Sequence, residues 1–352
     1  MFMTGVGTAA PDTTYTQAEG WRTLQNEPRF LSLTGRSRSL LRKVLLGDNG
    51  IETRHLVLDN LQAAFALNPD VLHARFLQHA PTLATAAANR ALETAGTAPG
   101  EIGALLISTC TGYLCPGLTS YVSEKLGLGP QALLLDLVGQ GCGAAIPNWR
   151  AAEALLSSGT SKKVLSVCVE ICSACFYLDD DPGVLISACL FGDGAGACVF
   201  SNEPGGAGRR VRYLAARTLL RPAERDALWM EQRNGMFRNV LSPRVPELAA
   251  QAVEEVLSGS LEDAGLTRSQ VVAWLLHPGG RVILDHLGRR LHLPETDLAW
   301  SAGVMRGYGN LSSASLYFVL KRALDGSAPS GYWWASSFGA GFSCHGQLLE
   351  VE

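Results

Sequence analysis

The chain has 352 residues, of which 47% are hydrophobic and 17% charged, a balance typical of a folded protein with a large buried core. Its formal net charge is −3 and its 29 lysines and arginines are scattered, which argues against a binder of nucleic acid or of an anionic membrane surface. Because no apolar stretch reaches the roughly 20 residues of a membrane span and the N-terminus lacks the features of a signal peptide, we expect a cytoplasmic protein without a membrane span.

Helices and apolar strands alternate through the first half of the chain. Small apolar residues recur at helical spacing over 80–96, and 102–110 is a strand too apolar to have a solvated face, as in covered, mostly parallel sheets. The elements predicted next are a helix over 117–126, a strand over 132–138, a helix over 143–156, a strand over 163–170 and strand structure around a glycine-rich turn over 189–200. This order predicts an α/β unit.

A second α/β series follows the glycine-rich stretch 201–208. Its predicted elements are a helix over 245–258, a strand over 271–276, a helix over 282–291, a polar segment up to 308, a helix over 311–324, and strands over 331–337 and 342–349. The second half therefore resembles the first.

The two series keep the same register when Cys142 is aligned with Asn310. Each of these residues follows a glycine and precedes a helix of small residues. The preceding strands end at Cys110, 32 residues before Cys142, and at His277, 33 residues before Asn310, and the following strands both begin 21 residues later. Three agreeing registers predict an internal duplication.

We therefore predict an N-terminal half over 1–205 and a C-terminal half over 206–352. Two copies of one α/β unit packed face to face bring their corresponding strand ends together, and ligands bind where such strands end. The four residues aligned by the repeat should approach one cavity.

Three of these residues have side chains that together suit thioester chemistry. Cys142 lies in the segment GQGCG at the start of a helix, where backbone N–H groups and the helix dipole favour a thiolate. His277 can stabilise that thiolate as an imidazolium and donate to a carbonyl oxygen. Asn310 cannot be the charge partner of a hydrolytic triad, but its amide can donate to a developing oxyanion or enolate.

The chain has nine cysteines, mostly within apolar segments. An odd number in such positions predicts reduced thiols rather than a disulfide framework. They do not form two matching C-x-x-C pairs, so we expect no metal site.

Four segments resemble the type III polyketide synthases, the chalcone and stilbene synthase family of the thiolase superfamily. They are GQGCG around Cys142, LFGDGAGA over 190–197, HPGG over 277–280 and GNLSSAS over 309–315. The resemblance implies a thiolase-like α/β fold in which the duplicated unit forms a five-layered αβαβα core. It also implies a homodimer, with Cys115 near the interface.

The resemblance further implies the catalytic roles. Cys142 accepts an acyl group from a CoA thioester, and His277 with Asn310 binds the thioester carbonyl of malonyl-CoA and promotes its decarboxylation. The enolate then attacks the acyl-cysteine and lengthens the chain by two carbons. The partners are malonyl-CoA and an acyl-CoA starter, and neither an organic cofactor nor a metal is needed.

Substrate-binding positions follow from the same resemblance. Phe191 and Phe237 match two gatekeepers between the CoA tunnel and the cavity. The absence of a side chain at Gly280 admits the pantetheine arm. Gly339 belongs to SFGAGFS, the counterpart of the GFGPG loop of the family, in which Ala340 replaces proline.

Three cysteines set the expected character of the cavity. Cys110, Cys172 and Cys175 occupy positions at which the plant enzymes have threonines, and a thiol makes the wall more apolar than a hydroxyl does. A fatty acyl starter and an alkylresorcinol or alkylpyrone product are therefore our first expectation. A malonyl-primed tetrahydroxynaphthalene-type synthase is the alternative, and a ketoacyl synthase using acyl carrier protein ranks third.

Overall fold

The computed structural model describes residues 1–205, 208–326 and 328–352. Nine strands join in one mixed sheet of order β11-β12-β13-β8-β1-β7-β6-β4-β5. Their bounds are β1 Phe2–Ala9, β4 Ala104–Ser108, β5 Leu133–Leu137, β6 Lys163–Glu170, β7 Gly194–Ser201, β8 Val211–Leu220, β11 Val271–Leu276, β12 Gly331–Gly339 and β13 Ser343–Val351. Since β1 and β8 pair at only two positions, the sheet consists of two parts joined at a short seam.

The two parts repeat one strand order. The order β1-β7-β6-β4 in the first part corresponds to β8-β13-β12-β11 in the second. Strand directions match as well, because β6 and β12 are each antiparallel to one neighbour and parallel to the other. This is the arrangement expected of a duplicated unit. The predicted boundary at 205/206 adjoins residues 206–207, which lie outside the described residues, so the division into two domains stays a prediction.

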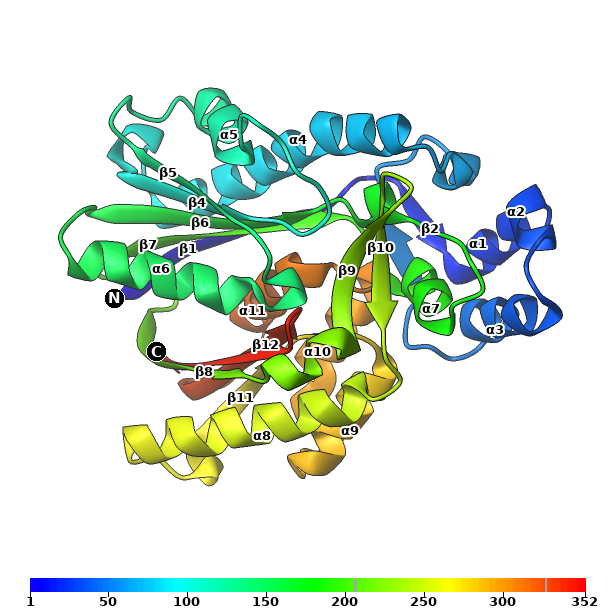
Figure 1. The fold of residues 1–352 in the computed structure, drawn as a ribbon. Helices are drawn as coiled ribbons and strands as arrows, with labels where there is room; N and C mark the ends of the chain where they lie inside the picture. The colour runs from blue at the N-terminus through cyan, green and yellow to red at the C-terminus, as the bar shows by residue number, and fades with distance from the viewer. Residues whose placement is uncertain (206–207, 327) are drawn as a thin grey trace.

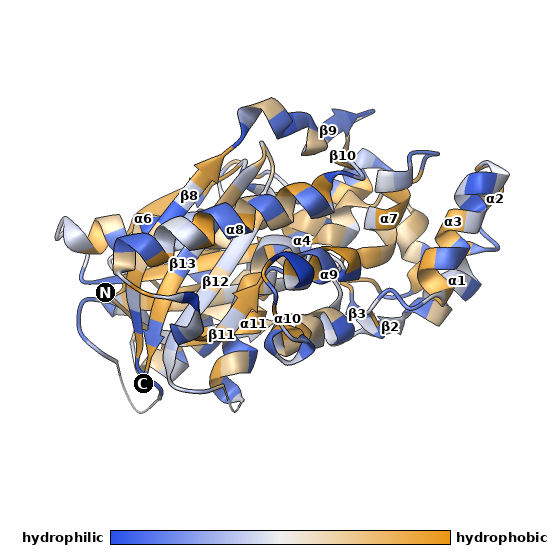
Figure 2. Cartoon of the chain, turned by 90° about the horizontal axis from the view of Figure 1, so that it is seen from below, coloured by the Kyte–Doolittle hydropathy of each residue, from blue (hydrophilic) through white to orange (hydrophobic). Residues whose placement is uncertain are grey.

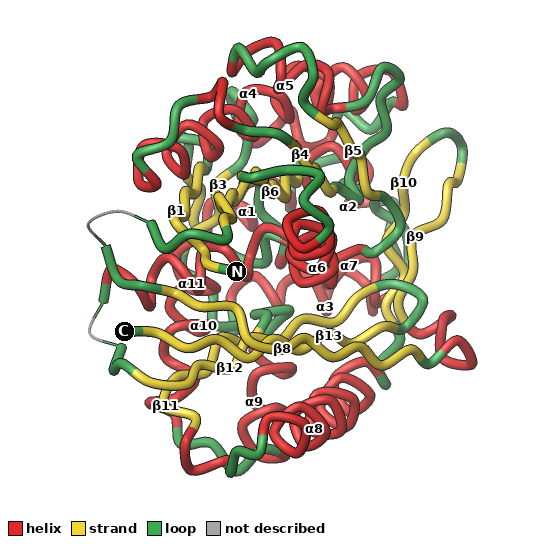
Figure 3. Tube along the Cα trace, turned by 90° about the vertical axis from the view of Figure 1, so that its left-hand side faces the viewer, coloured by secondary structure: helices red, strands yellow, loops and turns green. Residues whose placement is uncertain are grey.

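Helices form three further layers around the two parts of the sheet. Helices α4 (Pro69–Ala95) and α5 (Leu118–Leu126) cover the outer face of the first part, and α8 (Val245–Ala264) and α9 (Arg281–Arg290) cover that of the second. Helices α6 (Ala145–Ser157) and α11 (Ser315–Asp325) lie between them (Figures 1 and 3). The five-layered αβαβα fold predicted from the sequence is confirmed.

The middle layer is largely apolar because most residues of its two helices are buried, with Arg150 of α6 and Arg322 of α11 among the exposed exceptions. Trp149 of α6 and Tyr317 of α11 are fully buried and meet edge to face with ring centroids 5.6 Å apart. The outer helix α8, in contrast, alternates between hydrophobic and hydrophilic residues (Figure 2). The inner helices therefore join the two parts of the sheet through one continuous core.

The remaining helices and strands and one hairpin complete the regular structure of the described residues apart from the 3-10 helices. They are β2 (Thr14–Thr16), β3 (Thr53–His55), α1 (Gln17–Leu24), α2 (Pro28–Leu31), α3 (Gly35–Leu46), α7 (Pro182–Leu190), α10 (Glu295–Tyr308) and the hairpin of β9 (Leu228–Arg233) and β10 (Met236–Leu241). In Figure 1 helices α1, α2, α3 and α7 cluster beside this hairpin. No helix in the described ranges is long and apolar enough to cross a bilayer.

Two sequence-based assignments were wrong. The segment before Tyr308, expected to be a polar segment without a helix or strand assigned to it, is mostly the helix α10, whose first turn carries Glu295 and Asp297 as the helix dipole favours. The segment over 189–200 is not strand throughout, because its first two residues end α7 and β7 begins only at Gly194.

The close approach of β1 to α4 generates a stability prediction. A Cβ atom at Gly7 would lie 2.2 Å from the carbonyl oxygen of Ala87 and 2.4 Å from the nitrogen of Ala91, both backbone atoms of α4. Gly7→Ala should therefore lower the free energy of unfolding by about 1–3 kcal/mol, the usual cost of overpacking. Urea denaturation measures it. Gly100→Ala, whose Cβ would meet no atom within 4 Å, is the control, and an equal loss in both variants would contradict the packing argument.

Candidate active site

Cys142 lies in a short turn that the other half of the chain supports. The turn is the 3-10 helix η3 (Gly141–Gly143), directly before α6. The end of β12 packs against it so closely that a Cβ atom at Gly339 would lie 2.1 Å from the carbonyl oxygen of Gln140. Only glycine fits at position 339 with this backbone, so Gly339 lets the end of β12 pack directly against the turn that carries Cys142.

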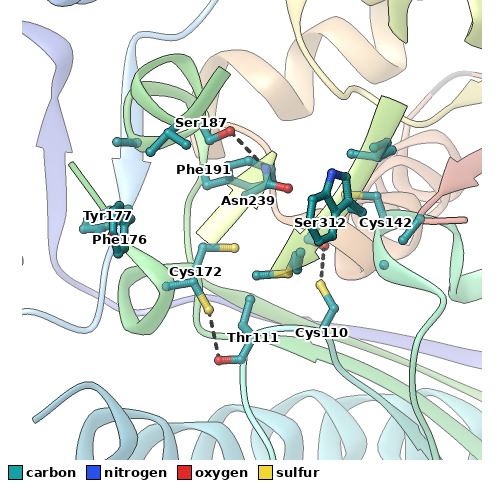
Figure 4. Close-up of a pocket in the computed structure, with 18 residues that line it drawn as sticks. Cys110, Thr111, Cys142, Cys172, Phe176, Tyr177, Ser187, Phe191, Asn239 and Ser312 are labelled. Atoms are coloured by element: carbon teal, nitrogen blue, oxygen red, sulfur yellow. Dashed lines mark hydrogen bonds between the residues drawn. The ribbon is translucent and has the colours of Figure 1, made fainter. Parts of the chain in front are cut away.

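Cys142 lines a cavity of about 620 Å³, which we call the front cavity (Figure 4). The predicted residues Cys110, Cys172, Cys175 and Phe191 line it as well. Other lining residues come from the β9–β10 hairpin, namely Leu228, Trp229, Met230 and Asn239. The wall is mostly apolar and carries four thiols.

Ser312 links two of these thiols. Its Oγ lies 3.3 Å from the Sγ of Cys142 and 3.3 Å from the Sγ of Cys110 (Figure 4). Ser312 is buried and has a φ of 49°, a left-handed conformation that costs a non-glycine residue about 1–2 kcal/mol. Its N–H donates to the Oδ1 of Asn310 at 2.8 Å, which holds this conformation. Sequence reasoning missed Ser312, although it belongs to the GNLSSAS segment.

Glu170, at the end of β6, is fully buried behind the front cavity. Its carboxylate accepts hydrogen bonds from the Cys110 N–H at 3.1 Å, from the Thr111 hydroxyl at 2.9 Å and from the Ser313 hydroxyl. The Sγ of Cys110 also lies 3.4 Å from Oε1. The carboxylate thus joins the end of β4 to the 3-10 helix η7 (Ser312–Ala314). Its only signal in the sequence is an acidic residue ending an apolar strand.

Hydrogen bonds connect the segment of His277 to Asn310, and Asn310 to Ser312 beside Cys142. The Asn310 Nδ2 donates to the carbonyl oxygen of Gly279, 3.1 Å away and two residues beyond His277. Nδ1 of the buried His277 has no hydrogen-bond partner in the part of the chain that the structure describes. The order of contacts is His277, Gly279, Asn310, Ser312 and Cys142, and within the described residues no hydrogen bond joins His277 directly to Cys142.

Burial is the main influence on the protonation of Cys142 and of His277. Burial raises the pKa of Cys142 to about 12; the hydrogen bond with Ser312 lowers it and the charge of Glu170 raises it further. Burial lowers the pKa of His277 to about 4. Near neutral pH the pair is therefore a thiol and a neutral imidazole. Both directions run against the resting thiolate and imidazolium expected from the sequence, because desolvation disfavours the charged form of each group.

Of two further predicted positions, Phe191 is among the residues that line the front cavity and Gly280 is not. Phe191 also forms a backbone bridge with Asn310. Gly280 precedes α9, and a Cβ atom there would meet only the Cδ1 of Leu190, at 3.5 Å. This is an ordinary contact, so the absence of a side chain leaves free space beside Gly280.

The structure places Phe237 elsewhere. It lines a different pocket, with Phe76 and Gly112. Two residues further along β10, Asn239 lines the front cavity and its Nδ2 donates to the Ser187 Oγ at 2.9 Å. The position that β10 contributes to the front cavity therefore carries an amide, not an aromatic ring.

Two family models match the chain. Residues 52–204 match the N-terminal domain of chalcone and stilbene synthases, and residues 215–348 match their C-terminal domain. The chain belongs to this family. It is therefore a type III polyketide synthase, a condensing enzyme of the acyltransferase kind.

Similar proteins extend over most of the chain. A 3,5-dihydroxyphenylacetyl-CoA synthase of Amycolatopsis orientalis is 28% identical, with 98% of this chain and 92% of that protein covered. An alpha-pyrone synthesis polyketide synthase-like protein of Mycobacterium tuberculosis is 30% identical, with 86% and 80% covered. A 1,3,6,8-tetrahydroxynaphthalene synthase of Streptomyces peucetius subsp. caesius is 32% identical, with 90% and 84% covered.

Solved structures share the fold. The C-terminal type III polyketide synthase domain of Steely1 from Dictyostelium superimposes with a TM-score of 0.90 at 24% identity, covering 99% of this chain and 98% of that one. The 1,3,6,8-tetrahydroxynaphthalene synthase of Streptomyces coelicolor gives a TM-score of 0.87 at 23% identity, covering 100% and 99%.

The raised pKa of Cys142 generates a kinetic prediction. Because the thiolate is the reactive form, the rate of alkylation of Cys142 by iodoacetamide should rise about tenfold per pH unit between about pH 7 and 9. Mass spectrometry of the peptide that contains Cys142 measures this rate, and the Cys142→Ala variant identifies the contribution of other thiols. A rate that is already constant below pH 7 would show a resting thiolate and contradict the neutral pair.

Two variants should move this alkylation profile in opposite directions. Glu170→Gln removes a negative charge that raises the pKa of Cys142, so alkylation at a given pH should become faster. Ser312→Ala removes a hydrogen bond that lowers the same pKa, so alkylation should become slower. Circular dichroism checks that each variant is folded. Shifts in the same direction would contradict the assigned causes.

Proposed function

We propose that this enzyme condenses malonyl-CoA repeatedly onto a fatty acyl starter carried by Cys142 and releases a cyclised alkylresorcinol or alkylpyrone. One observation supports the proposal most: Cys142 lies on the wall of a mostly apolar cavity and is connected through Ser312 to Asn310. We also propose that it acts as a cytoplasmic homodimer. Cys115, exposed in the single chain, would then lie at the interface.

Loading begins with attack of the Cys142 sulfur on the thioester carbonyl of the starter. Because burial raises the pKa of the thiol to about 12, its proton must leave as the carbon–sulfur bond forms. The neutral His277 is the base that the site offers. It accepts the proton and returns it to the departing CoA thiolate, so that the acyl group moves from one sulfur to another.

Extension requires an enolate of malonyl-CoA. The Asn310 amide uses one N–H toward Gly279, which leaves its second N–H for the thioester oxygen of malonyl-CoA, beside a donor from the His277 ring. Loss of CO₂ then places the electron pair on the enolate, which attacks the acyl-cysteine carbonyl. The Cys142 sulfur departs, and the chain on CoA is two carbons longer. An apolar cavity protects the acyl-enzyme because it excludes water.

The wall of the front cavity supports a fatty acyl starter. Cys110, Cys172 and Cys175 present weakly polar thiols where hydroxyls would bind a polar starter. The alpha-pyrone relative is consistent with this choice. We propose that no organic cofactor or metal takes part, because loss of CO₂ supplies the carbanion.

A malonyl-primed naphthalene-type synthase is the second candidate. The Asn239 amide and the Ser187 hydroxyl form a polar pair on the cavity wall that could bind a keto or carboxyl oxygen. A tetrahydroxynaphthalene synthase is among the similar proteins. The family match sets aside the ketoacyl synthase that uses acyl carrier protein.

Variants of the three proposed catalytic residues should separate loading from decarboxylation. Cys142→Ala should abolish transfer of a radiolabelled acyl group to the protein. His277→Ala and Asn310→Ala should lower the release of CO₂ from malonyl-CoA by about 100-fold or more, the usual effect of removing an oxyanion donor, and Asn310→Ala should lower acyl loading much less. Equal loss of both steps in Asn310→Ala would remove the proposed division of roles.

The choice of starter can be decided in one assay. Purified enzyme given malonyl-CoA alone should form little aromatic product, and added dodecanoyl-CoA should give alkylpyrone or alkylresorcinol, identified by mass spectrometry. Abundant naphthalene-type product from malonyl-CoA alone would instead favour the malonyl-primed candidate.

A further inference from the structure

A buried histidine that the proposed mechanism does not use packs against the turn that carries Cys142. His345 of β13 is only 3% exposed. A Cβ atom at Gly143 would lie 3.2 Å from the Cδ2 of its ring. The edge of the ring therefore covers the backbone of Gly143, the residue that directly follows the nucleophile.

The neighbouring strand holds the same residue through a hydrogen bond. Ser337 of β12 is the cross-strand partner of His345, and its Oγ donates to the carbonyl oxygen of Gly143 at 3.1 Å. Both Ser337 and His345 are buried. Two paired residues of the C-terminal half thus hold Gly143, one through its carbonyl group and one through packing of a ring.

A chain of hydrogen bonds that begins at the surface holds His345 in turn. Nη1 of Arg150, an exposed residue of α6, donates to Oγ1 of Thr218 at 2.9 Å, and this hydroxyl forms a hydrogen bond of 3.0 Å with Nδ1 of His345. Thr218 belongs to β8 and is the partner of His345 across the second edge of β13. Since α6 starts directly after the turn of Cys142, these contacts return to the element from which they began.

His345 is suited to packing rather than to proton transfer. Burial, and after it the positive charge of Arg150, lowers the pKa of His345 to about 4, so the ring is neutral near neutral pH. Its Nε2 is buried and has no hydrogen-bond partner among the residues that the structure describes. A protonated ring would place both a charge and an N–H without an acceptor in the core.

The turn of Cys142 needs such support because its own sequence does not fix it. Glycines occupy positions 139, 141 and 143, and Gly139 and Gly141 have φ values of 87° and 53°. Glycine adopts left-handed conformations without strain, but it also leaves the backbone free to adopt many others. The position of the Cys142 sulfur therefore depends on the residues packed against the turn.

We propose that His345, held by Thr218, is a positioning residue that fixes the turn so that the Cys142 sulfur meets the thioester carbonyl of the starter in the geometry of attack. The inference rests on the part of the proposed function in which Cys142 accepts the acyl group. A displacement of about 1 Å at a reacting atom can cost about 100-fold in rate, so a residue outside the cavity can control loading.

Two variants of Thr218 test the proposal. Thr218→Val removes the hydroxyl that holds His345 and keeps the branched shape, whereas Thr218→Ser keeps the hydroxyl. Thr218→Val should lower the rate of acyl transfer from dodecanoyl-CoA to Cys142 about tenfold or more, and Thr218→Ser should retain most of it. Release of CO₂ from malonyl-CoA, which the proposed function assigns to His277 and Asn310, should stay close to that of the wild-type enzyme in both.

A third variant and a control complete the experiment. His345→Asn removes the part of the ring that contacts Gly143, and it should show the same loss of loading without loss of CO₂ release. Thr94→Val, the same change at an exposed residue whose hydroxyl donates to the Arg90 carbonyl oxygen within α4, should leave both rates unchanged. Thermal unfolding checks that each variant is folded.

The outcomes separate this inference from the proposed function. Loading at the wild-type rate in folded Thr218→Val and His345→Asn would overturn the positioning role and leave the function standing, as would an equal fall of loading and CO₂ release in both. Undiminished acylation of Cys142→Ala would overturn the proposed function and the inference with it. A fall of loading alone in both variants, with recovery in Thr218→Ser, supports the positioning role.

Discussion

The buried carboxylate of Glu170 is the interaction on which the active site depends. A carboxylate without solvent is tolerated only when donors surround it, and these donors come from Cys110 and Thr111 after β4 and from Ser313 in η7. The first two belong to the N-terminal half of the chain and the last to the C-terminal half. The carboxylate therefore fixes η7, with Ser312, against the thiols, and neither half has a complete site alone.

Elements with continuous apolar patterns could be predicted from the sequence, and those defined by close packing could not. The expected strands over 163–170 and 271–276 match β6 and β11 at both ends, because buried strands consist mostly of apolar residues. β1, near the middle of the sheet, was not predicted, since Gly5 and Gly7 suggest a turn when no partner is known. In the structure these glycines admit the backbone of α4. The role of such glycines can therefore be recognised only from the tertiary packing.

In the candidate active site, too, some residues could be identified from the sequence pattern and others only from the tertiary structure. The repeat register brought Cys142 and Asn310 to one region from opposite halves, because register is a property of the sequence. Ser312 could not be identified in this way, since its role depends on a left-handed backbone and on two contacts far away in sequence. Asn239 was missed because the hairpin that carries it has no strict apolar alternation. Phe237, expected in the cavity from the resemblance, lines a different pocket.

Desolvation also explains how several thiols can share one cavity. Cys110, Cys142, Cys172 and Cys175 all line the front cavity, and burial raises the pKa of each thiol. Because the thiolate is the form that attacks disulfides, oxidants and thioesters, thiols kept protonated in this way do not compete for the acyl group. Cys142 and Cys110 share the contact with Ser312 that leads to Asn310, and Cys110 in addition lies 3.4 Å from Oε1 of Glu170, whose charge raises the pKa of its thiol further. Any selectivity between these two thiols therefore has to come from their positions, Cys142 in the turn before α6 and Cys110 beside Glu170, and not from the contact with Ser312.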